Sequence, residues 1–97
     1  MSSKLKQFKN EMAPAKEIYK NELMDFAKKY DFLGEMSLRE EPDLDTQDYI
    51  FTFEKLNGTS EKLLDSTLNE LYTHMEEFSK SKGIDKFCRN ATITYAW

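Results

Sequence analysis

Ninety-seven residues are enough for one small domain, and we expect 1–97 to fold as a single unit. Aromatic residues make up 13% of the chain and occur along its whole length, which argues against an intrinsically disordered protein. The net charge of −4 argues against broad nucleic-acid binding, and no stretch approaches the roughly 18 apolar residues of a membrane-spanning helix.

The first predicted element is a helical segment over 3–31. Between 15 and 30 the apolar residues recur at intervals of three and four, which is the pattern of an amphipathic helix. Upstream the pattern is continued by Leu5, Phe8 and Met12. Because proline lacks a backbone N–H and crowds the preceding turn, we expect a break or kink near Pro14.

Two strands and a second helix follow. Alternating apolar and polar residues predict strands over 35–39 and 48–56, the second being rich in aromatic and β-branched residues. The acidic connection 40–48 between them predicts a hairpin with a loose tip. A clear amphipathic stripe then predicts a helix over 60–82, which ends at Gly83 because glycine suits the left-handed residue that terminates a helix.

The last segment, 87–97, alternates again and predicts a third strand. The order α-β-β-α-β indicates an α+β two-layer sandwich, in which a three-stranded antiparallel or mixed sheet carries two helices on one face. The alternation leaves the strand order open. It assigns these residues to the covered sheet face: Met36, Leu38, Tyr49, Phe51, Phe53, Ile93, Tyr95 and Trp97.

Residues with reactive side chains form no recognised motif. His74 lies beside the apolar stripe of the second helix and is interpreted as a boundary residue, and Cys88 lacks the neighbours that activate a thiol. The acidic loop at 43–48 lacks the glycine and flanking helices of a calcium loop, so we interpret it as solvated. We therefore assign no catalytic, metal-binding or cofactor-binding residue and expect a protein without enzymatic activity.

These observations favour a protein-interaction module whose partner is another protein or a second copy of itself. Two sets of residues are candidates for its surface. Tyr95 and Trp97 end the predicted last strand, whose edge could pair with another chain. The other set precedes Pro14 and extends beyond what a small sheet covers: Leu5, Phe8 and Met12. The alternative for both sets is that they complete the core.

A second hypothesis is a small-molecule-binding domain, with an apolar pocket between the sheet and the helices lined by several methionines. Nucleic-acid binding through the lysine-rich first segment is disfavoured, because acidic residues are interspersed among the lysines. Cys88 is the sole cysteine, and the first residues contain no apolar signal-peptide core. We therefore expect a reducing, cytoplasmic setting.

Overall fold

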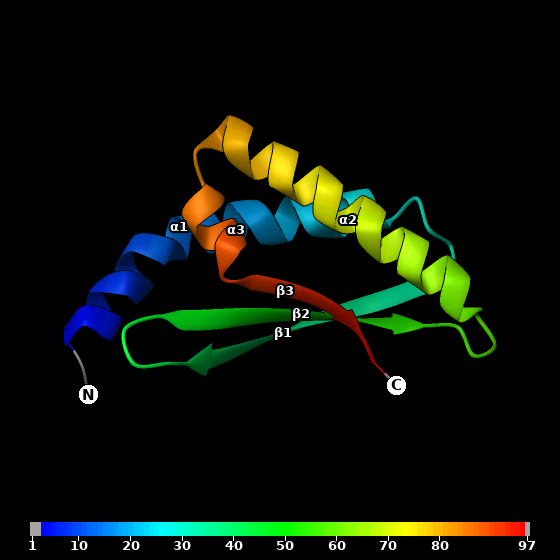
Figure 1. Cartoon of the computed structure of the whole chain (residues 1–97), viewed down its shortest axis with the longest axis horizontal. Coiled ribbons are helices and arrows are strands. Elements are labelled where there is room, and N and C mark those ends of the chain that lie inside the picture. Colours follow the sequence, from blue (N-terminus) through cyan, green and yellow to red (C-terminus); the bar gives the residue numbers. More distant parts are fainter. Residues whose placement is uncertain (1–2, 97) are drawn as a thin grey trace.

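The computed structural model describes residues 3–96, and its elements form two layers (Figure 1). In chain order they are α1 (Ser3–Ala27), β1 (Leu33–Pro42), β2 (Gln47–Lys55), α2 (Glu61–Lys82), α3 (Asp85–Arg89) and β3 (Ala91–Tyr95). The strands form one layer, and the helices lie together on one side of it. The predicted two-layer α+β fold is confirmed, with α3 as an additional short helix.

Helix α1 continues through Pro14, so the chain contains a proline inside a helix rather than a break. Its first turns, blue in Figure 1, slope relative to the rest of the helix, as expected where proline removes one backbone donor. One buried stripe runs along both halves: Leu5, Phe8, Met12, Ala15, Tyr19, Leu23 and Ala27. Tertiary packing of this stripe stabilises the helix across the proline. The helix ends at Ala27, four residues before the predicted end.

The central strand is β2. It pairs antiparallel with β1 and parallel with β3, so the sheet is mixed and its order is β1-β2-β3. The parallel pairing requires a crossover, which α2 provides by returning the chain to the other end of the sheet.

Most of the predicted acidic connection is strand. Glu41 pairs with Asp48 and Pro42 pairs with Gln47, which leaves only residues 43–46 as the hairpin loop. The loop is closed by a hydrogen bond of 2.8 Å from the Asp43 N–H to the Thr46 carbonyl. The prediction of a loose tip over 40–48 was therefore wrong, because pairing with β2 extends β1 to Pro42.

Helix α2 has the ends that its sequence predicts. The Ser60 hydroxyl accepts a hydrogen bond from the Leu63 N–H at 3.2 Å, which satisfies a free donor of the first turn. At the other end Gly83 has φ of 69°, a left-handed conformation that other residues adopt only with strain.

The prediction of a strand over 87–97 was wrong in its first part, because Asp85–Arg89 forms α3. The register explains the difference. Ala91 pairs with Tyr49, so a strand continued backwards would bring Phe87 opposite Asp45, in the exposed hairpin loop. The short helix instead turns Phe87 inward, where its side chain is fully buried.

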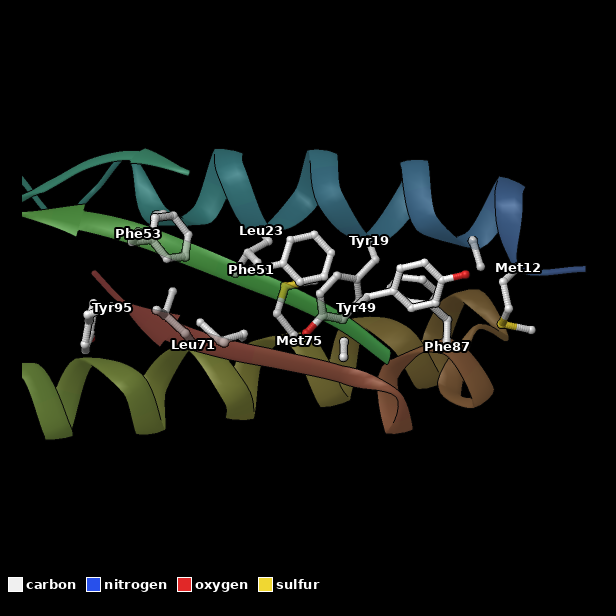
Figure 2. Close-up of a cluster of buried hydrophobic side chains, with 14 of the residues drawn as sticks. Met12, Tyr19, Leu23, Tyr49, Phe51, Phe53, Leu71, Met75, Phe87 and Tyr95 are labelled. Atoms are coloured by element: carbon white, nitrogen blue, oxygen red, sulfur yellow. The ribbon is translucent and has the colours of Figure 1, made fainter. Parts of the chain in front are cut away.

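Aromatic rings fill the middle of the space between sheet and helices (Figure 2). The Phe87 ring lies 4.5 Å from that of Tyr49 and 5.2 Å from that of Tyr19, measured between centroids. Tyr19 also packs against Phe51 at 5.2 Å. Rings from α1, β2 and α3 thus meet in one cluster. The sheet-face assignment from the sequence is confirmed for the six residues from Met36 to Ile93 and for Tyr95, whereas Trp97 lies outside the described residues.

Phe87 joins these elements, so its truncation tests the core. We expect Phe87→Ala to lower the free energy of unfolding by about 3–5 kcal/mol, the usual cost of removing a buried aromatic ring. Arg89→Ala, in the same short helix, is the control. Its exposed ion pair with Asp85 contributes little, so a change below about 0.5 kcal/mol is expected. Urea denaturation of both variants measures the difference, and equal effects would contradict the described position of α3.

Burial also predicts the response to high pH. It raises the pKa of Tyr95 from 10.0 to about 12, with a smaller contribution from the Asp65 carboxylate, and it raises the pKa of Tyr19 and Tyr49. Because the folded-state pKa lies above the unfolded value, the stability linked to the neutral phenols is complete below pH 10 and is lost as pH rises towards 12.

We therefore expect the free energy of unfolding in urea to fall between pH 10 and about 12. Tyr95→Phe removes the hydroxyl that donates to the Leu64 carbonyl at 2.9 Å, so this variant should be less stable at neutral pH. Its stability should then fall less steeply above pH 10. If the free energy of unfolding fell equally steeply with pH in the variant and in the unchanged chain, the assigned role of Tyr95 would be contradicted.

Candidate interaction surface

The first candidate set is covered by the chain itself. The side chains of Leu5, Phe8 and Met12 are each 6% exposed, and the last two belong to the main core cluster. Figure 2 shows Met12 at the same end of the cluster as Phe87. The Lys86 ammonium of α3 lies 5.5 Å from the Phe8 ring centroid and pairs with Glu11 at 3.2 Å. A partner approaching this half of α1 would therefore meet Lys86 and Glu11 rather than the apolar side chains.

The second candidate set consists of Tyr95, which the structure describes, and Trp97, which it does not. Tyr95 is 6% exposed and its hydroxyl is bound to the Leu64 carbonyl of α2, so its ring belongs to the interior. Trp97 lies outside the described residues. The main chain of β3 is an edge of the sheet, as the strand order requires, and this is the feature that the sequence prediction invoked.

A side chain of α2 occupies the outer edge of β3. The Ile93 N–H donates to the Tyr72 hydroxyl at 2.7 Å, and the same hydroxyl donates to the Ile93 carbonyl at 3.2 Å. Both outward-facing groups of the middle residue of β3 are thus satisfied within the chain. An incoming strand would have to displace Tyr72 to pair there, and covering an edge in this way is how proteins prevent unwanted strand pairing.

The outer edge of β1 is different. Hydrogen-bonded and non-hydrogen-bonded pairs alternate along an antiparallel ladder, and the bond between Asp43 and Thr46 fixes which pairs are bonded. From Met36 to Pro42 the register contains no shift. Three residues therefore direct their backbone groups towards β2, namely Ser37, Arg39 and Glu41. Three direct theirs outward, namely Met36, Leu38 and Glu40.

These outward groups remain available. Among the backbone hydrogen bonds that the described residues form outside their helices and strand ladders, none involves the N–H or carbonyl of Met36, Leu38 or Glu40. The free stretch is short, because a bulge lies between Leu33 and Met36 and Pro42 ends the strand. Bulges and prolines are features that limit edge pairing. The edge of β1 thus offers about three residues to a further strand.

A shallow apolar groove runs between α1 and this edge. It has a volume of about 160 Å³, and its walls include Met24 of α1 and Met36 of β1, with Phe53 of β2 beneath them. Met24 is 44% exposed, so part of its side chain is open to a partner. Side chains of a strand added to β1 would alternate between this groove and the uncovered sheet face.

The uncovered face of the sheet is polar. On β1 this face carries the exposed Ser37 and Arg39, and Glu35, which belongs to the bulge before Met36 and also borders the groove, is exposed as well. The Arg39 guanidinium contacts the Glu41 carboxylate at 3.2 Å, a pair in which both side chains are largely exposed. Ile50 of β2 is the apolar exception and is half-buried. This pattern is typical of a sheet face in water rather than of a second core.

His74 takes part in the contact between α1 and α2, which the sequence alone did not reveal. Its Nε2–H donates to the Glu22 carboxylate at 2.6 Å, and its ring stacks on that of Phe26 with centroids 3.8 Å apart. Glu22 and Phe26 are separated from His74 by about fifty residues of sequence, so no local pattern could have identified them. The Cys88 thiol faces the Met75 carbonyl at 3.9 Å.

No metal-ligand set forms among residues 3–96: the acidic, histidine and cysteine side chains there do not gather in threes around one point. In the same residues, neither long helix has an apolar stretch that could cross a bilayer. Comparison with protein-family models, curated proteins and solved structures found no match. We therefore infer a function from the surfaces described above.

The role of Tyr72 in covering the edge of β3 can be tested by removing its hydroxyl. Tyr72→Phe should lower the free energy of unfolding by about 1–3 kcal/mol, because it leaves the Ile93 N–H and carbonyl without their partner. The Ile93 amide should exchange with deuterium faster than in the unchanged chain. The matched control is Tyr30→Phe, which removes a hydroxyl bound to the exposed Glu70 carboxylate and should leave exchange at Ile93 unchanged.

Proposed function

We propose that the protein is a protein-interaction module that binds its partner by adding a strand to the edge of β1. The observation that carries this proposal is the difference between the two edges of the sheet. Tyr72 occupies the outward groups of Ile93 on β3, whereas the outward groups of Met36 and Leu38 on β1 have no partner in the described chain. Strand addition is a common way for a sheet edge to recognise another chain.

The groove beside β1 supports the same function. Backbone hydrogen bonds to Met36 and Leu38 would supply affinity, and the alternate side chains of the added strand would supply specificity. Those directed to the helix side would meet Met24 and Met36, whose flexible side chains adapt to apolar partners. We further propose that this occurs in a reducing, cytoplasmic setting, because Cys88 has no second cysteine with which to pair.

The experiment is site-specific photocrosslinking in the cells that naturally make the protein. A photoreactive phenylalanine analogue at Ser37, exposed on β1, should form a crosslink to a protein, either a second copy or another chain. The same analogue at Thr92, exposed on β3, is the matched control and should form none. Crosslinks from both positions in equal amount, or from neither, would refute binding at the β1 edge.

Two further variants show whether the backbone of β1 is responsible. Leu38→Pro removes an outward N–H without removing a bond to β2, and edge strands tolerate proline at such positions. Leu38→Lys leaves the backbone intact and introduces a charge on the helix side of the β1 edge, two residues from Met36. Each should reduce the Ser37 crosslink by about tenfold or more, while circular dichroism reports that the fold is retained. A full-strength crosslink from both folded variants would contradict the proposal.

A further inference from the structure

We propose that the partner of the β1 edge is a second copy of this chain, joined antiparallel to the first about a twofold axis at Ser37. This inference rests on the proposed function, because it names the partner of the same edge. Antiparallel pairing of the two β1 strands would join two three-stranded sheets into one. In the proposed register Ser37 faces Ser37 of the second copy, and Met36 faces Leu38 of the second copy.

The charge pattern on the uncovered face selects this register. With Ser37 on the axis, Glu35 of each copy, at the bulge that precedes the regular register, comes next to Arg39 of the other, so the pairing brings together two opposite-charge pairs. Both side chains are exposed in the single chain. Arg39 already contacts Glu41 of its own strand at 3.2 Å, so its guanidinium would be shared between Glu41 and Glu35 of the second copy. Opposite charges directly across two strands stabilise their pairing, and like charges destabilise it.

The helix side of the interface is complementary as well. Leu38 of the second copy would lie beside Met36 and enter the groove that Met24 and Met36 form. Leu38 is half-buried in the single chain, so the pairing would cover its remaining surface. The twofold axis repeats each contact, which gives two apolar pairs on this side and two charged pairs on the other.

Neighbouring registers lack this match. The backbone allows only shifts of two residues, because the outward groups belong to alternate positions. With Leu38 on the axis, Glu35 would face Glu41 of the second copy, and Met36 would face the charged Glu40. A further shift would bring Arg39 opposite Arg39. The register centred on Ser37 therefore avoids the like-charge contacts that these shifts create.

Two lysines of α1, one helical turn apart, are already paired, and Lys28, just after α1, lines the groove. The Lys16 ammonium contacts the Glu40 carboxylate at 3.6 Å, and the Lys20 ammonium contacts that of Glu17 at 3.3 Å. Met24 lies one helical turn after Lys20 on the same side. The two copies would thus meet along partly neutralised flanks with an apolar centre, so repulsion between their α1 helices is small.

Exchange of the two charges gives a direct test. Sedimentation of the full chain at concentrations up to about 200 µM should show a reversible dimer, as expected for a small interface. Glu35→Arg and Arg39→Glu should each weaken that dimer by about tenfold or more, because each turns two attractive pairs into two repulsive ones. A mixture of the two variants should form a heterodimer, since its cross-strand charges are again opposite. Asp48→Arg, an equal charge change on β2, is the matched control and should leave the dimer intact.

The outcomes separate this inference from the proposed function. A chain that stays monomeric while Ser37 still crosslinks a different protein would overturn the second copy as partner and leave the β1 edge as the binding site. Absence of both the dimer and the crosslink would overturn both proposals. A dimer that both charge variants leave unchanged, or that the mixture fails to restore, would overturn the register centred on Ser37.

Discussion

The burial of one row of aromatic side chains on β2 is the constraint on which the rest of the structure depends. Tyr49, Phe51 and Phe53 lie on the same side of the strand and are almost completely buried. Side chains of a strand alternate between its two faces, so this row requires a cover on one side only. Helices α1 and α2 provide that cover, and the opposite side retains polar residues. The strand with the most apolar surface becomes the centre of the sheet, which leaves β1 and β3 as its edges.

The local sequence pattern was sufficient to predict those elements whose determining residues lie close together in the chain. The stripe of α2, its Ser60 cap and its terminal Gly83 lie within one stretch of sequence, and the predicted helix agrees with the observed one to within a residue at its start. The alternation in β2 identified the buried row in the same way. Of the break or kink predicted at Pro14, the structure has a helix that bends but continues, because the packing of the stripe on both sides outweighs the local cost of proline in a helix.

The errors and gaps arose where distant residues decide the outcome. Phe87 fits the alternation of a strand, and only the position of the hairpin tip makes a helical turn the better way to bury it. Leu5 and Phe8 were recognised as apolar, but their sequence does not tell whether this chain or another covers them. The role of Tyr72 depends on Ile93, 21 residues later, and no short motif describes that contact. The β1 edge was missed for the same reason, because an edge is defined by the absence of a neighbour.

The contact between Tyr72 and Ile93 also limits how large an assembly can become. Edges of a sheet are where chains add without end to form fibrils. If two copies join through β1, the only edges left in the combined sheet are the two β3 strands, and each carries its own tyrosine cover. A further copy would have to displace Tyr72 to pair along β3, so growth stops at a pair. The hydroxyl of Tyr72 would thereby limit the assembly to a dimer and prevent the growth of a polymer.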